Sequence, residues 1–378
     1  MILLTGAGLM INSFARLLRV NPGFQPERLL TFDASLGGRA YMDNSKRFHL
    51  VQQLRERVQT QPAVNSAATV YGLPFGTMLN SLVAVNIDRD SPADAPEGAR
   101  AGWRVISPNY FETIGASLLA GRTFSDKLDT AGTVPVTIIN EAFQQKYFPN
   151  ENPIGKRIKP ITISSKWHEI VGVINDVKLT GLNAEPAPEL YQPDSQQAPW
   201  MFSLVVRSTL PRRQIEKLVR TEAAALDKDL PLFNVRTMEQ AISASVAPRR
   251  FTMLLIGLFA ALALTLTAVG IYGVISYSVS QQTREIGIRI ALGAPRWSVP
   301  NLFLREGLML ALVGAAIGLA GSLALTRLMA AQLFGVNATD PATFAAVSLL
   351  LIAVALFACL LPAQRATRID PMEALRYE

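Results

Sequence analysis

The sequence predicts an α-helical membrane protein that carries a large α+β domain, and three observations support this fold class. Three apolar stretches occupy the last third of the chain, at residues 251–283, 307–326 and 341–364. A long segment of mixed polarity, residues 21–248, lies before them and alternates strand-like and helix-like patterns. A shorter apolar run opens the chain at residues 1–15.

The three apolar stretches are long enough to cross a bilayer. A helix rises about 1.5 Å per residue and the hydrocarbon core is about 30 Å thick, so about 20 apolar residues are needed. The stretches contain no Lys, Arg, Asp or Glu, and each such residue at mid-bilayer costs about 2.5–3.5 kcal/mol on insertion scales. We therefore predict transmembrane helices at about residues 251–280, 305–328 and 342–363.

The opening apolar run is shorter than a full span. It ends before Arg16, and no Lys or Arg precedes it, as a secretory signal would require. We interpret residues 1–20 as a first transmembrane helix that is truncated in this chain. The predicted domains are then this partial helix, a domain over residues 21–248, and a membrane domain with three helices over residues 249–378.

The positive charge of the chain is concentrated beside the membrane. Of the net +7, residues 21–248 contribute +1, from 24 basic and 23 acidic side chains, and the remaining residues contribute +6. Basic side chains at a bilayer rim meet anionic lipid head groups. The distribution therefore predicts the lipid bilayer as a partner and argues against a nucleic acid.

The residues that usually carry chemistry are scarce. The single cysteine, Cys359, lies inside the last apolar stretch, which excludes a disulfide framework within the chain. His49 and His168 are far apart in the sequence and have no partner at metal-ligand spacing. No motif of a serine or zinc hydrolase is present. We predict no catalytic residue, no metal site and no cofactor, although carboxylates alone could serve a membrane-tethered hydrolase.

Two β-α-β patterns frame the large domain. The first has strands at residues 29–36 and 67–71, with an amphipathic helix between them that presents Phe48, Val51, Leu54 and Val58. The second has strands at residues 202–207 and 232–236 around a helix at residues 211–226. Together they predict a split ferredoxin-like layer.

An inserted, smaller lobe is predicted between the two β-α-β units. Its expected strands lie at residues 103–107, 134–140 and 169–175, and its expected helices at residues 108–115 and 141–147. The whole segment of 228 residues is long enough to bury a core of its own.

Several sequence fragments resemble one family of transporters. In the large domain these are residues 105–111 (Val-Ile-Ser-Pro-Asn-Tyr-Phe), 121–124 (Gly-Arg-Thr-Phe), 139–141 (Ile-Asn-Glu), 152–156 (Asn-Pro-Ile-Gly-Lys) and 171–177 (Val-Gly-Val-Ile-Asn-Asp-Val). They resemble the periplasmic core domain of MacB-type transporters. Residues 284–294 (Arg-Glu-Ile-Gly-Ile-Arg-Ile-Ala-Leu-Gly-Ala) and 369–376 (Ile-Asp-Pro-Met-Glu-Ala-Leu-Arg) resemble the signature of FtsX-like permeases.

The resemblance implies a non-catalytic permease subunit of an ABC complex, with four transmembrane helices and the large domain between the first and the second. It implies mechanotransmission: a cytoplasmic ATPase would drive motion that the membrane helices carry to the periplasmic domain, for efflux or envelope transport. The implied location is the bacterial inner membrane. The implied partners are an ABC ATPase subunit, a second permease copy in a dimer or a paralogous half of a duplicated permease, and a periplasmic adaptor.

Two groups of residues are candidate functional sites. For coupling to the ATPase, the family signature points to Arg284, Glu285, Ile286, Gly287, Ile288, Arg289, Ala291, Leu292, Gly293 and Ala294. For helix packing, small residues recur every three or four positions, at Gly307, Ala311, Gly314, Gly318 and Ser322. The first group could also be a cytoplasmic loop packed on its own helices, and the second could serve a dimer or only the bundle.

The alternatives differ in what moves and where ATP binds. The sequence contains no Gly-x-x-x-x-Gly-Lys-[Ser/Thr] motif, so ATP is expected on the partner subunit. A signalling or scaffold transmitter that activates a cell-wall hydrolase without transport is the alternative function. A secondary transporter is disfavoured because the spans lack ionisable residues.

The arginines at the helix ends give weak support for one orientation in the membrane. If the segment at residues 280–300 is cytoplasmic, seven of these arginines lie on the cytoplasmic side and five on the outer side.

Overall fold

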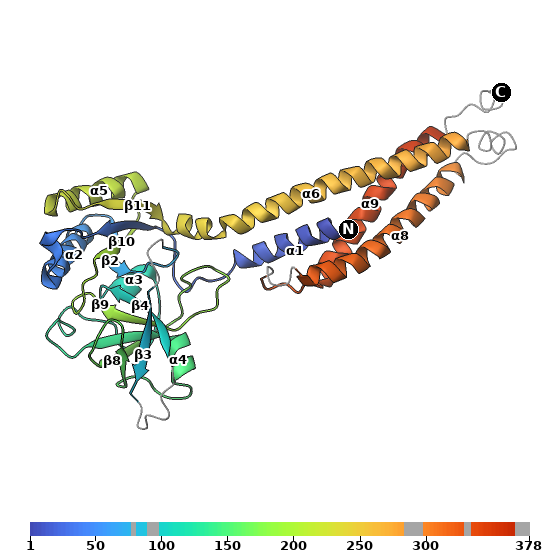
Figure 1. Cartoon of the computed structure of the whole chain (residues 1–378). Coiled ribbons are helices and arrows are strands. Elements are labelled where there is room, and N and C mark those ends of the chain that lie inside the picture. Colours follow the sequence, from blue (N-terminus) through green and yellow to red (C-terminus); the bar gives the residue numbers. More distant parts are fainter. Residues whose placement is uncertain (77–80, 89–97, 283–297, 329–333, 367–378) are drawn as a thin grey trace. The chain divides into compact units, whose positions relative to one another are not determined.

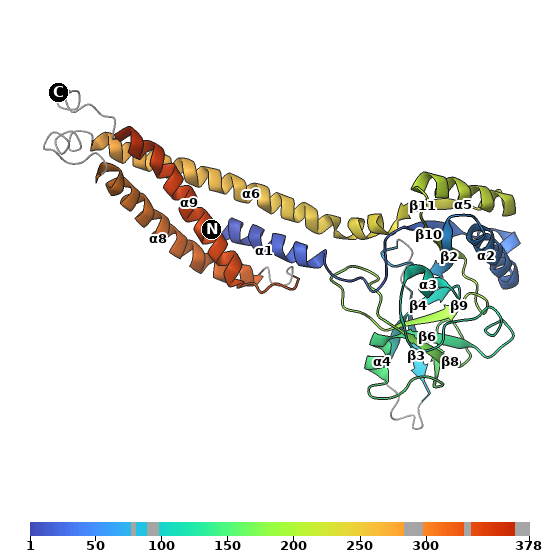
Figure 2. The ribbon, with the colours of Figure 1, turned by 180° about the vertical axis from the view of Figure 1, so that it is seen from behind.

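The computed structural model describes residues 1–76, 81–88, 98–282, 298–328 and 334–366, and it divides into two compact units (Figures 1 and 2). The helical unit consists of Met1–Arg19 and Ala247–Glu378. The α+β unit consists of Val20–Val246. Each unit is described below by itself.

The helical unit contains α1 (Ile2–Leu17), α8 (Ser298–Leu328), α9 (Pro341–Ala366) and most of α6 (Met238–Gln281). Three segments in it are long and apolar enough to cross a membrane: Met238–Gln281, Gly307–Arg327 and Pro341–Leu360. They overlap the three predicted spans. Helix α1 has 16 residues and is shorter than a full span.

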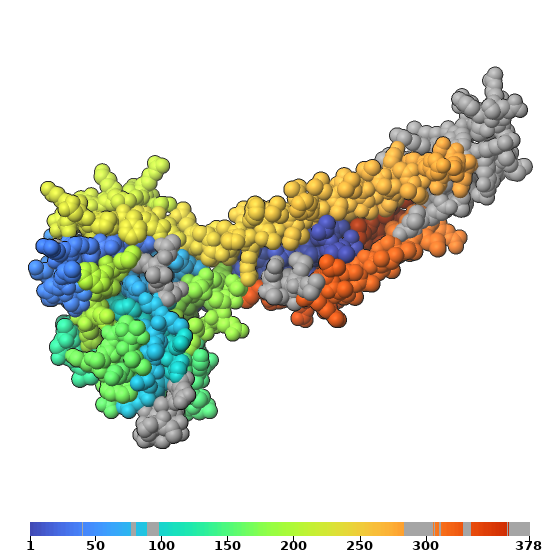
Figure 3. Space-filling model, in the orientation of Figure 1, coloured from blue at the N-terminus to red at the C-terminus, as the bar shows by residue number. Residues whose placement is uncertain are grey.

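Helix α6 begins well before the apolar stretch that predicts it. Met238 and Ala241 in its first turns are buried, whereas the apolar part leaves large side chains exposed. Helix α6 is the yellow-to-orange segment of Figure 3. These exposed side chains include Phe251, Leu254, Leu258, Leu262, Leu266 and Val269. A helix that exposes apolar groups on most sides requires an apolar surrounding, and a lipid bilayer supplies one.

The first part of the α+β unit is a four-stranded layer. Its strands are β1 (Leu29–Ser35), β2 (Val64–Tyr71), β10 (Met201–Ser208) and β11 (Leu232–Thr237), in the order β11-β1-β10-β2 with antiparallel neighbours. Helices α2 (Asn44–Gln59) and α5 (Arg212–Leu226) share one core with this sheet. All six elements were expected from the sequence at nearly these positions.

Local sequence explains why α2 and α5 form where they do. Asp43 caps α2, because its side chain accepts a hydrogen bond from the backbone N–H of Ser45. Pro211 stands immediately before the first residue of α5. Proline is tolerated there because a backbone N–H at the start of a helix has no carbonyl partner within the helix. Val51, Leu54 and Val58 recur at helical spacing in α2 and are fully buried, so one stripe of the helix faces the core.

The second part of the α+β unit is inserted between β2 and β10. Its elements are β3 (Ser81–Ile87), β4 (Arg100–Ile106), α3 (Tyr110–Ile114), β5 (Leu118–Gly121), β6 (Val136–Asn140), α4 (Glu141–Tyr147), β7 (Arg157–Pro160), β8 (His168–Ile174) and β9 (Glu189–Pro193). The strands predicted at 103–107, 134–140 and 169–175 correspond to β4, β6 and β8. Strands β3, β5, β7 and β9 were not predicted.

Strand pairing closes the inserted part into a ring. Six strands pair in the order β4-β3-β7-β8-β6-β9, and β9 then pairs in parallel with β4. Closure of a sheet removes the free edges that would otherwise pair with other chains. The ring has its own core, with Val85, Phe143, Ile158 and Leu190 fully or almost fully buried.

The ring and the four-stranded layer belong to one continuous sheet. Strand β2 of the layer pairs with β4 of the ring through Val70 opposite Ile106 and Tyr71 opposite Val105. The two cores contain separate sets of residues. The inserted part is therefore a lobe with a core of its own, and two paired residues on β2 and β4 join its sheet to the layer.

Candidate functional site

The predicted coupling segment lies outside the described residues. Arg284 to Ala294 falls in the stretch between the end of α6 at Gln281 and the start of α8 at Ser298. Its role in contacting an ATPase stays a prediction.

The predicted small-residue stripe of α8 contacts two other helices of its own unit. A Cβ added at Gly307 would lie 2.2 Å from Cys359 Sγ of α9, and one at Gly318 would lie 2.4 Å from the Met1 side chain. The hydroxyl of Ser322 donates to the backbone O of Gly318 at 2.6 Å. Small residues at these two positions therefore let α8 approach its neighbours closely.

The middle of the stripe is open. Nothing lies within 4 Å of a Cβ added at Gly314. Ala311 and Gly314 line an apolar cavity of about 410 Å³ with residues of α6 and α9, among them Gly270 and Leu351. These intramolecular contacts do not report on a second copy of the chain, so a dimer role of the stripe stays a prediction.

The α+β unit holds a second candidate site, built on one face of the ring. Leu82 of β3 is opposite Gly102 of β4, and Gly102 is opposite Glu189 of β9. Residues opposite one another in neighbouring strands share a face of the sheet. The glycine has no side chain, and the Glu189 carboxylate fills the space above it. A Cβ at Gly102 would lie 2.1 Å from Glu189 Oε2.

Arg104, two residues along the same strand, pairs with this carboxylate. Its Nε lies 3.4 Å from Glu189 Oε2, its Nη2 donates to Glu189 Oε1 at 3.4 Å, and its Nη1 donates to the Trp103 carbonyl at 3.2 Å. Both side chains are buried, with exposed fractions of 1% and 6%. Gly72, whose φ is +86°, makes room for the guanidinium, because a Cβ there would lie 2.5 Å from Arg104 Nη1.

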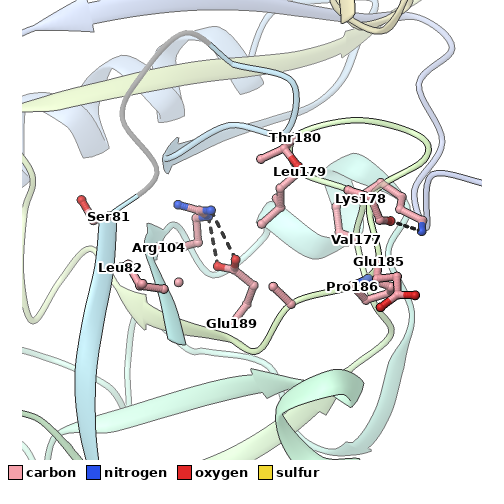
Figure 4. Close-up of a pocket in the computed structure, with 13 residues that line it drawn as sticks. Ser81, Leu82, Arg104, Val177, Lys178, Leu179, Thr180, Glu185, Pro186 and Glu189 are labelled. Atoms are coloured by element: carbon pink, nitrogen blue, oxygen red, sulfur yellow. Dashed lines mark hydrogen bonds and ion pairs between the residues drawn. The ribbon is translucent and has the colours of Figure 1, made fainter. Parts of the chain in front are cut away.

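A loop at residues 177–187 covers this pair and leaves a cavity of about 190 Å³ (Figure 4). The loop is held by backbone bonds from Phe75 N–H to the Leu179 carbonyl at 2.7 Å and from Lys178 N–H to the Pro22 carbonyl at 2.8 Å. The Lys178 ammonium donates to the carbonyl of Ala184 within the loop. The loop over the cavity is therefore anchored on two sides.

A further buried charge cluster links the ring to the four-stranded layer. Arg55 of α2 donates to Asp194, which follows β9, at 3.4 Å and to Asp126 at 3.1 Å. The Thr69 hydroxyl of β2 donates to the same oxygen of Asp194 at 3.3 Å. Arg55 and Asp194 are each 4% exposed. Since α2 and β2 belong to the layer and Asp194 to the ring, the cluster fixes one part against the other.

Burial changes the protonation of these groups. It raises the pKa of Glu189 to about 7, although Arg104 opposes the shift. It also raises the pKa of Asp194 to about 7, against the attraction of Arg55. Burial lowers the pKa of His168, since it disfavours the charged imidazolium, and the backbone of Val136 opposes this. In each case desolvation is the largest effect.

The sequence predicts no metal site. Among the residues that the structure describes, no three or more His, Cys, Asp or Glu side chains gather where they could hold an ion. His168 is buried and lies 3.3 Å from Gln192, whereas His49 is exposed. The two histidines are therefore in different environments.

Sequence reasoning missed Arg104 and Glu189, and also Arg55 and Asp194. The signal for the first pair is weak but present: β4 reads Arg-Ala-Gly-Trp-Arg-Val-Ile and places a charge and a glycine inside an otherwise apolar strand. Charge inside a buried strand requires a partner. The partner could not be identified, because Glu189 is 85 residues away in the sequence.

Two family profiles match this chain. The MacB-like periplasmic core domain matches residues 3–228, and the FtsX-like permease C-terminal domain matches residues 257–371. Together they cover the α+β unit up to residue 228, helices α8 and α9, and the part of α6 from residue 257 onward.

Individual relatives are moderately similar. The uncharacterized ABC transporter permease YknZ of Bacillus subtilis is 28% identical over 281 residues, which is 72% of this chain and 69% of that protein. The pyoverdine export ATP-binding/permease protein PvdT of Pseudomonas syringae pv. tomato is 27% identical, over 81% of this chain and 44% of its own length. The macrolide export ATP-binding/permease protein MacB of Marinobacter nauticus is 25% identical, over 68% and 40%. This chain spans less than half the length of these two ATP-binding/permease relatives.

Two solved structures are similar to parts of the chain. The periplasmic region of MacB from Actinobacillus actinomycetemcomitans has a TM-score of 0.41 at 17% identity and covers 60% of this chain and 95% of that one. The extracellular domain of YknZ, a noncanonic ABC-type transporter from Gram-positive bacteria, has a TM-score of 0.35 at 15% identity, with coverage of 54% and 100%.

Proposed function

Because this chain belongs to the family that joins a MacB-like periplasmic core domain to an FtsX-like permease domain, we propose that it is the permease subunit of a MacB-like ABC transporter. The observation that carries the proposal is the order of the two matches, residues 3–228 followed by residues 257–371. It is supported by three helices that are long and apolar enough to cross a membrane.

The subunit does not hydrolyse ATP itself in this proposal. The 378 residues contain no phosphate-binding Gly-x-x-x-x-Gly-Lys-[Ser/Thr] loop. A cytoplasmic ABC ATPase binds the nucleotide, and its closure moves the permease. The mechanism is mechanotransmission: the membrane helices carry the motion to the α+β unit, which acts on substrate outside the membrane.

The residues 284–294 form the contact with the ATPase. Glu285 and Arg289 are four residues apart, so they face the same side if this stretch is helical. Its isoleucines and Leu292 supply the apolar surface that docks on a partner. The α+β unit is then periplasmic, the protein lies in the inner membrane, and a second permease copy or paralogous half and a periplasmic adaptor complete the assembly.

The proposal includes the finer architecture. Helices α1, α6, α8 and α9 form a four-helix membrane domain, with the α+β unit between the first and the second. The strand order β11-β1-β10-β2, with α2 and α5 in one core, supports the split ferredoxin-like description of the layer.

Purification from native membranes in a mild detergent tests the function. The chain alone should show no ATP hydrolysis, and an ABC ATPase should be recovered with it. Glu285→Ala and Gly287→Ala should keep this recovery but lower substrate export by the complex, since they alter the contact and not the fold. Arg327→Ala, at the other end of α8, is the matched control and should export normally.

Repeated purification without an ATPase would count against the proposal. Normal export by both coupling variants would remove the assigned role of residues 284–294. A deletion strain could lose activation of a cell-wall hydrolase while its export stays normal. In that case the chain would be a signalling transmitter.

A further inference from the structure

The cavity over Gly102 has the features of a ligand site that the permease function leaves unexplained. It lies in the α+β unit, between the sheet face of β3, β4 and β9 and the loop at residues 177–187 (Figure 4). We propose that it binds a small molecule or group that presents a neutral hydrogen-bond donor, a hydroxyl or an amide N–H, on an apolar body. The site does not depend on the transport function proposed above.

The carboxylate of Glu189 supplies the polar end of the site. Its Oε2 atom is buried and accepts no hydrogen bond from any residue that the structure describes. Arg104 Nε is 3.4 Å from this oxygen, which is longer than the 2.7–2.9 Å usual for a charge-assisted hydrogen bond. A buried acceptor without a donor costs about 1–3 kcal/mol, and a ligand that donates to it recovers that cost.

The surrounding charges select a neutral donor. Arg104 lies beside Glu189, and Lys178 lines the same cavity, so a cationic ligand would meet two positive groups. Glu189 and Glu185 line it as well, so an anion would meet two carboxyl groups. A hydroxyl or amide N–H satisfies the carboxylate oxygen without adding charge to a buried place.

The remaining walls select the apolar body. Leu82, Val177, Leu179 and Pro186 line the cavity, and Gly102 forms its floor. Because Gly102 lacks a side chain, the Glu189 carboxylate lies directly over the sheet backbone there and forms the polar part of the floor. The volume of about 190 Å³ limits the occupant to a group of about the size of one aromatic ring.

Disulfide tethering on the full chain tests the chemistry of the site directly. Leu82→Cys places a thiol at the rim, where Leu82 is 61% exposed, and Cys359→Ala removes the only native cysteine. The protein is equilibrated under mild reduction with two disulfide reagents that differ only in a 4-hydroxyphenyl or a 4-methoxyphenyl group. Intact mass measures each adduct. We expect the hydroxyl reagent to be enriched about fivefold, because only it donates to Glu189.

Two matched controls separate recognition from reactivity. Met42→Cys in the same Cys359→Ala background carries a thiol that is equally open, since Met42 is 69% exposed, but it lies away from the cavity and should take both reagents equally. Glu189→Leu with Leu82→Cys should abolish the enrichment. Glu189→Gln retains a carbonyl acceptor and should keep part of it.

The result on Leu82→Cys alone is decisive even if a Glu189 variant folds poorly. Equal labelling by the two reagents, or preference for the methoxy reagent, would overturn the proposal. An enrichment that persists in a folded Glu189→Leu protein would also overturn it, because the acceptor would then not be Glu189.

Discussion

At the residue scale, the described part of the α+β unit buries three arginines, Arg47, Arg55 and Arg104, and the last two are paired with acidic side chains. Arg104 is paired with Glu189, and Arg55 with Asp194 and Asp126. Removing charges from water is expensive, and replacing a buried pair by apolar residues is often neutral or stabilising. The pairs therefore do more for position than for stability: the first shapes a cavity, and the second joins two lobes with separate cores.

The buried acid Asp194 predicts a dependence of stability on pH. Burial raises its pKa to about 7, so the folded state holds a proton that the unfolded state releases near pH 4. Its contribution is fully present below the unfolded pKa and is lost as the pH rises through 7. Between pH 5.5 and pH 8 this amounts to on the order of 2 kcal/mol, or a fall in melting temperature of about 4–8 °C.

The comparison of Asp194→Asn with the wild type isolates this contribution. The variant should lose the Asp194 part of the fall in melting temperature between pH 5.5 and pH 8 and keep the part that comes from Glu189, whose pKa burial also raises to about 7. Asp88→Asn, which breaks an exposed pair with Arg157, should keep the wild-type dependence. His168 acts with the opposite sign, since its lowered pKa removes stability as the pH falls below about 6.5. An unchanged slope in Asp194→Asn would contradict the assignment.

At the element scale, α8 shows how one helix can pack tightly at its ends and loosely in its middle. Gly307 contacts α9 and Gly318 contacts α1, whereas Gly314 faces a cavity. Lipid supplies no hydrophobic drive between helices, so close approach through small residues has to supply the packing. Glycine therefore contributes to helix packing at positions 307 and 318 but not at position 314.

Two alanine substitutions on α8 test this difference. Gly307→Ala would place a methyl group 2.2 Å from Cys359 Sγ, so α8 and α9 must separate. Overpacking of this kind costs about 1–3 kcal/mol, and we expect a lower melting temperature of the detergent-solubilised protein. Gly314→Ala, with open space around it, should melt like the wild type or slightly higher. Adding Cys359→Ala to Gly307→Ala should restore stability, and equal effects of the two glycine substitutions would refute the packing.

At the scale of the whole molecule, the chain combines a unit with buried apolar cores and a unit with exposed apolar helices. The α+β unit buries two cores, whereas the helical unit leaves large apolar side chains exposed along α6, α8 and α9. The proposed function requires more than this contrast. It requires the α+β unit and the segment at residues 284–294 to be on opposite sides of the membrane.

Thiol labelling of intact cells tests that arrangement. In a Cys359→Ala background, Met42→Cys reports on the α+β unit and Arg289→Cys on the coupling segment. A membrane-impermeant maleimide, applied with access to the periplasm, should label Met42→Cys, and it should label Arg289→Cys only after the cells are lysed. Labelling of both positions before lysis would place them in one compartment and would exclude mechanotransmission across the bilayer.

Elements with a clear hydrophobic period in their own sequence were predicted correctly. Helices α2 and α5, and strands β1, β2, β10 and β11, follow from hydrophobic periodicity, because each has one clear buried face. The three apolar spans follow from length and composition alone. The fragments at residues 105–111 and 284–294 predicted the family, and the two matching profiles confirm it.

Only the tertiary structure decided the closed ring and the cavity. Strands β5 and β7 have four residues each, too few to show a period, and β9 contains Glu189, Gln192 and Pro193. The row of Leu82, Gly102 and Glu189 depends on the register of three strands that are far apart in the sequence. Register is set by pairing between distant segments and not by the composition of any one of them. A buried glutamate that lies over a glycine is therefore visible only once the chain has folded.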